Sequence, residues 1–68
     1  MLRVGSANTD MFLLGTSKMI ELGEKVYILD ATNLPNWERD QLIFVWPESE
    51  GPDCSWSISV QKHEVEYL

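Results

Sequence analysis

The sequence predicts a single, mainly β domain: a small antiparallel barrel or strongly bent sheet of five or six short strands. Three observations support this prediction. The chain has 68 residues, which is enough for one domain. Apolar residues at positions 54, 56, 58 and 60 alternate with serines, which is the period of a strand with one buried face. Turn-forming residues separate the other short apolar runs.

Residues 1–22 are expected to form an N-terminal hairpin segment. Residues 11–14 and 19–22 are short apolar runs that can pair with each other, and residues 15–18 between them have the composition of a hairpin turn. Residues 1–5 are a candidate for a further edge strand.

Residues 23–68 are expected to form the barrel-like core. The runs 25–30 and 41–46 are rich in β-branched and aromatic residues, and the second stops at Pro47. Both runs are apolar on both faces. We therefore expect two central strands that are covered on each side, or strands with one face kept dry by a partner.

Two connections join these strands to the rest of the core. Residues 48–53 have the composition of a hairpin turn, whereas residues 31–39 make a longer connection. Within or next to that longer connection, residues 37–40 can form one helical turn, which is too short to be stable alone.

The strand predicted over residues 54–60 loses its phase at its end, because Val65 and Tyr67 are out of register with Val60. Residues 61–63 must absorb this slip as a bulge, a short turn or a single 3-10 turn. Residues 64–68 then form a last short strand.

One known fold has this pattern. The run Leu-Gly-Glu-Lys-Val-Tyr-Ile at residues 22–28 resembles the opening strand of SH3-like barrels, and the slip near Gln61 is similar to the short turn before their last strand. The resemblance covers residues 20–68 and implies an SH3-like barrel. The chain has neither the Ala-Leu-Tyr-Asp-Tyr-type segment nor the Trp-Trp pair of peptide-binding SH3 domains, so the resemblance does not imply binding of proline-rich ligands.

The charge is negative and uneven. The formal net charge is −6, and residues 35–68 contribute seven acids against two bases. Phosphate-binding surfaces need clustered Lys and Arg, so direct binding to nucleic acid or to an anionic membrane is disfavoured. The acidic half either keeps the protein soluble or faces a basic partner.

The expected location is the cytoplasm. The longest apolar run, residues 42–46, is far shorter than the roughly 20 residues that span a bilayer, and no signal peptide is visible. The single cysteine, Cys54, cannot form an internal disulfide, which favours a reducing compartment.

No residues form a recognisable catalytic or metal-binding motif. Cys54 and His63 are the only soft or borderline metal ligands, and a metal site needs three or four. Pairing of His63 with Ser59 or Cys54 would lack an acid to orient the imidazole. The pairs Glu48–Glu50 and Glu64–Glu66 are more typical of exposed edges than of acid–base catalysis. We therefore expect a non-enzymatic protein without cofactor or metal.

The three tryptophans are a stronger signal. Trp56 alternates with serines and is expected in the core, whereas Trp46 precedes Pro47 at a strand end, where its ring is expected to be half exposed. Trp37 lies between Asn36 and Glu38. It is either an interface anchor or a plug for the barrel end.

The first functional hypothesis is a protein–protein interaction module, for instance an accessory subunit or a homo-oligomer. One barrel has one interior, yet the two central strands carry two apolar sets. One set is expected to comprise Tyr27, Leu29, Ile43 and Val45, and the opposite set Val26, Ile28, Leu42, Phe44 and Trp46. Residues 11–22, a second subunit or a partner must cover one set. The predicted partner-binding residues are Trp37, Tyr27, Leu29, Ile43, Val45, Trp46, Glu38, Asp40, Glu48 and Glu50.

The alternative is an acidic inhibitor, of the phage-encoded type, that blocks the basic site of a nucleic-acid-binding protein. Its surface would comprise Glu38, Asp40, Glu48, Glu50, Asp53, Glu64 and Glu66.

Overall fold

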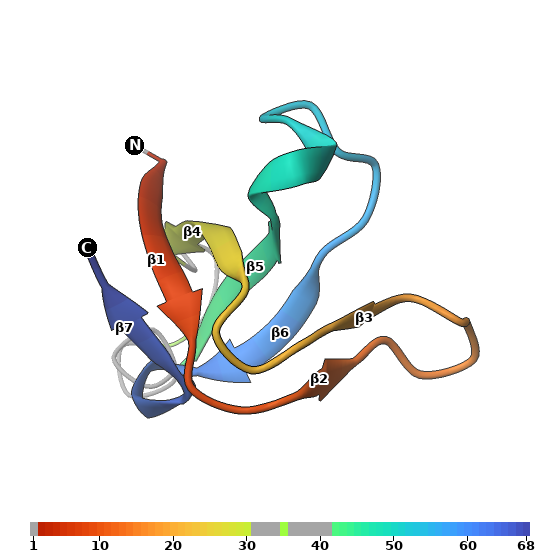
Figure 1. The fold of residues 1–68 in the computed structure, drawn as a ribbon, viewed down its shortest axis with the longest axis horizontal. Coiled ribbons are helices and arrows are strands. Elements are labelled where there is room, and N and C mark those ends of the chain that lie inside the picture. The colour runs from red at the N-terminus through yellow and green to blue at the C-terminus, as the bar shows by residue number, and fades with distance from the viewer. Residues whose placement is uncertain (1, 31–34, 36–41) are drawn as a thin grey trace.

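The structure is a computed structural model that describes residues 2–30, 35 and 42–68 (Figure 1). It contains a five-stranded antiparallel sheet in the order β6-β5-β4-β1-β7 and a separate β2–β3 hairpin. The strands are β1 (Arg3–Ala7), β2 (Met11–Phe12), β3 (Met19–Ile20), β4 (Lys25–Asp30), β5 (Leu42–Pro47), β6 (Ile58–Gln61) and β7 (Val65–Tyr67). The large sheet curls into a half-barrel, so the mainly β, strongly bent fold predicted from the sequence is confirmed.

The described residues include two single 3-10 turns, η1 (Glu48–Glu50) and η2 (Lys62–Glu64), and none of them forms a helix long and apolar enough to cross a membrane. The turn η2 confirms that the phase slip after Val60 is absorbed by a 3-10 turn. Glu64 accepts a hydrogen bond from the Gln61 backbone N–H at 2.8 Å, and the Gln61 side chain bonds the Glu64 backbone in return. This capping box allows the chain to pass from β6 to β7, which lie on opposite edges of the sheet.

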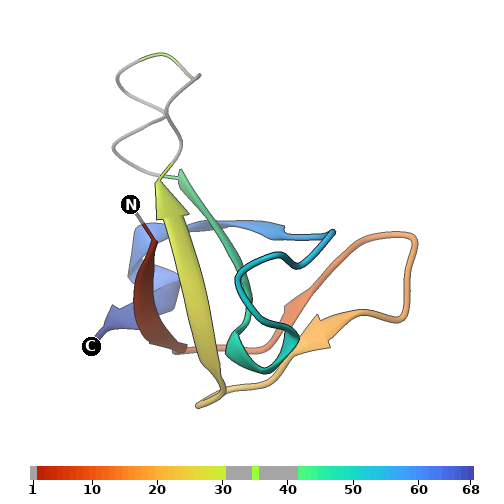
Figure 2. The same cartoon turned by 90° about the horizontal axis from the view of Figure 1, so that it is seen from above.

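The sequence suggested an edge strand over residues 1–5, and the structure corrects this expectation. β1 lies inside the sheet, between β4 and β7. The close approach of β7 depends on Gly5, because a Cβ atom at this position would lie 2.5 Å from the Glu66 carbonyl oxygen and 2.7 Å from Ile28 Cδ1. The N-terminal and C-terminal strands are thus side by side (Figures 1 and 2).

The strand predicted over residues 54–60 is shorter than expected. β6 begins at Ile58, where its register with β5 also begins. Before it, the Cys54 thiol donates a hydrogen bond to the Trp56 carbonyl oxygen at 3.3 Å. Such a local side-chain to backbone bond competes with strand pairing. Alternation alone therefore overestimated the length of this strand.

The core fills the concave side of the half-barrel. Val26 and Ile28 of β4 and Ile43 and Val45 of β5 are fully buried there. The β2–β3 hairpin contributes Met11 and Ile20 to the same cluster. The chain's own N-terminal hairpin therefore covers the concave face of the sheet.

This arrangement corrects the predicted division of the apolar residues. In the β4–β5 register, Tyr27 pairs with Trp46 and Ile28 pairs with Val45. Because paired residues of antiparallel strands point to the same side, Ile43 and Val45 belong to the core and not to the face that carries Tyr27 and Leu29. Periodicity within each strand could not reveal this, since it leaves open how the phases of two strands combine.

Candidate functional site

The convex side of the sheet, which faces away from the core, also carries apolar side chains. We define the convex face by six side chains that the register places on one side of β1, β4 and β5: Val4, Tyr27, Leu29, Leu42, Phe44 and Trp46. Most are half-buried, and Leu29 is 40% exposed. A sheet that faces water usually alternates buried apolar residues with polar ones. Here both sides of the two central strands are apolar.

Trp46 is the most firmly held residue of the convex face. Its ring lies 5.9 Å from that of Tyr27, centroid to centroid, at an interplanar angle of 43°. Its Nε1–H donates a hydrogen bond to the Gly51 carbonyl oxygen at 3.0 Å, and the side chain is only 7% exposed. The expectation of a half-exposed ring is therefore wrong, because the segment after η1 folds back over the indole.

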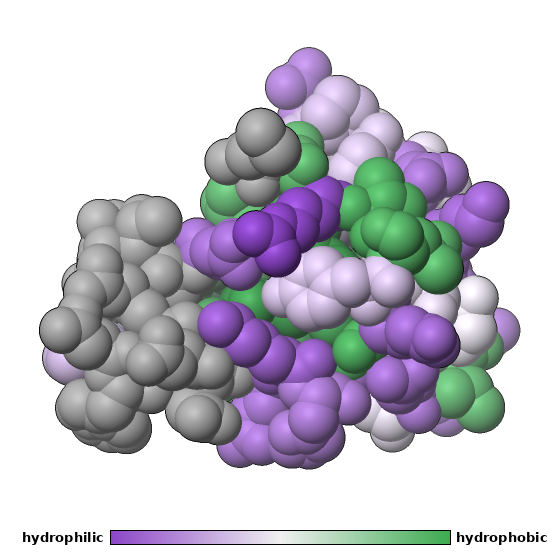
Figure 3. Space-filling model, turned by 90° about the vertical axis from the view of Figure 1, so that its left-hand side faces the viewer, coloured by the Kyte–Doolittle hydropathy of each residue, from purple (hydrophilic) through white to green (hydrophobic). Residues whose placement is uncertain are grey.

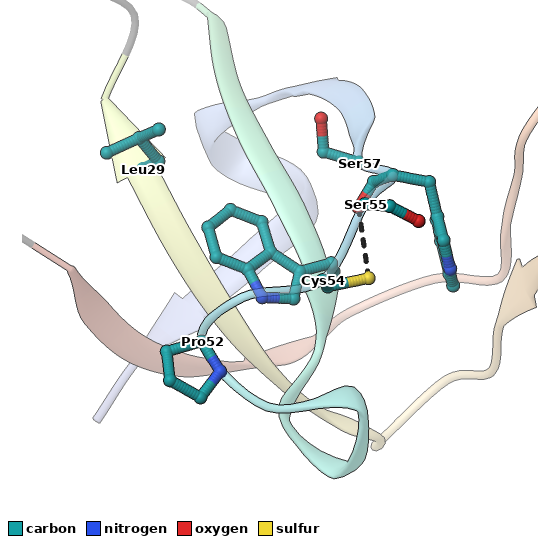
Figure 4. A pocket seen from close by; sticks show the side chains of 7 residues that line it. Leu29, Pro52, Cys54, Ser55 and Ser57 are labelled. Carbon is teal, nitrogen blue, oxygen red and sulfur yellow. Dashed lines mark hydrogen bonds between the residues drawn. The ribbon is translucent and has the colours of Figure 1, made fainter.

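A shallow cleft of about 240 Å³ opens beside this tryptophan. Its walls come from β4, β5 and the segment before β6, and it is lined by Leu29, Trp46, Pro52, Cys54, Ser55, Trp56 and Ser57. Figure 4 shows Leu29 and Pro52 on separate walls, with the Cys54 sulfur and two serines nearby. Small-molecule pockets usually enclose about 300–1,000 Å³, so this cleft is better suited to one or two side chains of a protein partner.

Trp56 joins this cleft to the hairpin. Trp56 was expected in the core. Its side chain is half-buried, packs against the core cluster without belonging to it, and also lines the cleft. The Lys18 ammonium lies 5.8 Å from the centre of the Trp56 ring, which is within cation–π range.

The loop beside the cleft is acidic. Glu48 and Glu50 lie in η1, and Asp53 sits between the lining residues Pro52 and Cys54. Glu50 and Asp53 are exposed. A partner that enters the cleft would therefore meet carboxylates at this side.

Figure 3 shows a different side of the molecule, along β1 and β7. There, apolar groups (green) and polar groups (purple) lie next to each other.

The structure brings together only some of the predicted partner-binding residues. Tyr27, Leu29 and Trp46 lie on the convex face. Ile43 and Val45 are 0% exposed in the core, so their prediction as partner-binding residues is wrong. Glu48 and Glu50 lie in η1. The last three predicted residues, Trp37, Glu38 and Asp40, lie outside the described residues.

Sequence reasoning missed the segment before β6 as a wall of the cleft. Pro52, Ser55 and Ser57 line it. The serine alternation was interpreted as the solvent face of a strand, and the available signal was Pro52, which breaks strands. Among the residues that the structure describes, no group of three His, Cys, Asp or Glu side chains is placed to hold a metal ion.

The fold and the cleft define a small β module with an aromatic-lined convex face. No protein-family model, no curated protein and no solved structure matches this chain.

Proposed function

We propose that this protein is a small non-enzymatic protein–protein interaction module that binds its partner through the convex face and the adjoining cleft. The observation that carries the proposal is the 40% exposed Leu29 beside the cleft, on a sheet face whose neighbouring residues are apolar. Contiguous exposed apolar groups next to polar ones are typical of protein interfaces.

The cleft has the properties of a preorganised anchor site. Tyr27 and the hydrogen bond to Gly51 hold Trp46 in one orientation, so little side-chain entropy is lost when a partner binds. The partner side chain that fits is apolar, because Leu29, Trp46 and Pro52 contribute apolar surface.

The connection order supports the finer proposal of an SH3-like barrel. The first and last strands are neighbours, a long hairpin follows β1, and a 3-10 turn precedes β7. The sequence lacks the aromatic motifs of proline-rich-peptide binders, so the partner we propose is a folded protein surface. The location we propose is the cytoplasm.

The test compares capture by the wild-type protein with capture by Leu29→Ser. Partners retained from the native host should be reduced at least about tenfold, because an interface anchor is lost. Leu68→Ser is the matched control, since it removes an equally large and more exposed leucine at the C-terminus. Equal capture by the Leu29→Ser protein and the wild type would overturn the proposal.

The acidic loop favours a second candidate function, an inhibitor that occupies a basic site of a nucleic-acid-binding protein. The supporting observation is that the loop leading to the cleft carries three acids: Glu48 and Glu50 in η1, and Asp53 between the lining residues Pro52 and Cys54. Binding in this mode should weaken steeply with salt and should be lost on charge reversal at Glu48 and Glu50. Binding through the convex face should instead persist at high salt and after charge reversal at Glu48 and Glu50.

A further inference from the structure

The β2–β3 hairpin has two apolar faces. The pair Met11–Ile20 points into the core, where the two side chains are 4% and 0% exposed. The neighbouring pair Phe12–Met19 points the other way and is 62% and 40% exposed. The role of the hairpin in covering the core explains why Met11 and Ile20 are apolar. It does not explain why Phe12 and Met19 are apolar.

Two further leucines enlarge the exposed set. Leu14 at the hairpin turn is 93% exposed, and Leu22 at the hairpin base is 66% exposed. We define the hairpin surface as Phe12, Leu14 and Met19, which alternation places on one side of the hairpin. Leu22, two residues after Ile20, is exposed at the hairpin base but does not belong to this side. A two-stranded ribbon that served only as a lid would carry polar residues at these positions.

Phe12 and Met19 are also close neighbours within this surface. The Leu13 backbone N–H donates to the Lys18 carbonyl oxygen at 3.1 Å, so Leu13 and Lys18 occupy a hydrogen-bonded position of the ladder. The pattern alternates, which makes Phe12–Met19 a non-hydrogen-bonded pair, the kind whose side chains approach more closely. A thioether beside an aromatic ring forms an adaptable apolar contact surface.

The charges around the hairpin surface indicate the kind of partner. The only described base of the hairpin, Lys18, is turned toward Trp56. The next register position beyond Met11–Ile20 is occupied by two exposed acids, Asp10 and Glu21. Alternation places these carboxylates on the side of Phe12 and Met19.

We propose that the hairpin surface is a second docking site, distinct from the convex face, for a protein segment that presents apolar side chains next to Lys or Arg. A second copy of this chain is disfavoured as the occupant. Each copy has a net charge of −6, and like charges would meet at the hairpin base.

Two synthetic peptides of equal length serve as probes, one of alternating Leu and Lys and one of alternating Leu and Glu. Isothermal titration should show that the Leu-Lys peptide binds the wild-type protein and that the Leu-Glu peptide binds at least about tenfold more weakly. The double variant Phe12→Ser/Met19→Ser should weaken Leu-Lys binding at least about tenfold. Glu21→Gln should weaken binding and reduce its salt dependence.

Leu29→Ser is the matched control, because it removes one exposed apolar side chain from the convex face. Unchanged binding by this control supports the hairpin surface, whatever the outcome of the partner capture described above. Three results would overturn the proposal: loss of binding in the Leu29→Ser protein but not in the hairpin variant, equal binding of both peptides, or a dimer in sedimentation that the hairpin variant abolishes.

Discussion

Tyr27 and Trp46 are register partners in neighbouring strands, and their rings contact each other on the convex side of the sheet, 5.9 Å apart and tilted by 43°. Aromatic pairs favour tilted or offset contacts of this kind. The contact with Tyr27 helps to hold the Trp46 ring, which lines the cleft. The β4–β5 register places both rings on the side away from the core.

Trp46→Phe should destabilise the protein by about 1–3 kcal/mol, because it removes both the Nε1–H donor to Gly51 and part of a buried ring. Urea unfolding followed by circular dichroism measures this loss. Tyr27→Phe is the control that keeps both rings in contact, and it should change the free energy of unfolding by less than about 1 kcal/mol. Equal losses in the two variants would mean that the bond to Gly51 contributes nothing.

Ile43→Ala should destabilise the protein by about 2–5 kcal/mol, because the side chain is fully buried on the concave side. Leu29→Ala removes three carbon atoms from a 40% exposed side chain and should have a much smaller effect. Thermal unfolding of both variants tests the assignment of the two residues to opposite faces. A larger loss for Leu29→Ala than for Ile43→Ala would contradict it.

Gly5→Ala should destabilise the protein by about 1–3 kcal/mol and loosen β7, since the new methyl group would overlap the Glu66 carbonyl oxygen and Ile28. Hydrogen exchange of the β7 amides should accelerate more than that of β5. Gly15→Ala provides the contrast, because Gly15 has open space around it but a φ of +80°. Its effect should remain within the hairpin turn, at about 1 kcal/mol.

Burial raises the pKa of Tyr67 above its ordinary value of 10.0, and the nearby Asp30 raises it further, whereas Arg3 lowers it. The guanidinium of Arg3 lies 5.5 Å from the Tyr67 ring centre and 3.9 Å from the Asp30 carboxylate. Because the folded protein holds the phenol proton more tightly than the unfolded chain, this contribution to stability is complete below pH 10.0 and is lost as the pH rises through the folded-state pKa.

Asp30→Asn should therefore lower the pKa of Tyr67, and Arg3→Met should raise it. Nuclear magnetic resonance titration of ring-labelled tyrosine measures both shifts, with Tyr67→Phe identifying the signal. A pKa that stays the same in both variants would show that only burial controls this phenol.

Much of the fold could be predicted from local sequence patterns. β4 coincides with the predicted strand over residues 25–30, and the turn at Gly15 and the 3-10 turn after Gln61 occur where the sequence indicated them. These features are local, because strand propensity, glycine at positive φ and a break in periodicity each involve residues close together in the chain.

The candidate site was predicted less well. Leu29 and Tyr27 were correctly placed among the exposed-face residues, but Ile43 and Val45 were grouped with them. The walls of the cleft combine β4, β5 and a segment that does not form a strand. No local pattern brings these three segments together.

Two features follow from the amino-acid sequence alone: the two central strands are apolar on both faces, and a hairpin precedes them. Three others depend on how the strands pair: the face that each residue joins, the position of β1 between β4 and β7, and the exposure of Phe12 and Met19 on the hairpin. The physical reason is that register is a relation between strands. A shift of one residue exchanges the two faces of a strand without changing its composition or its period.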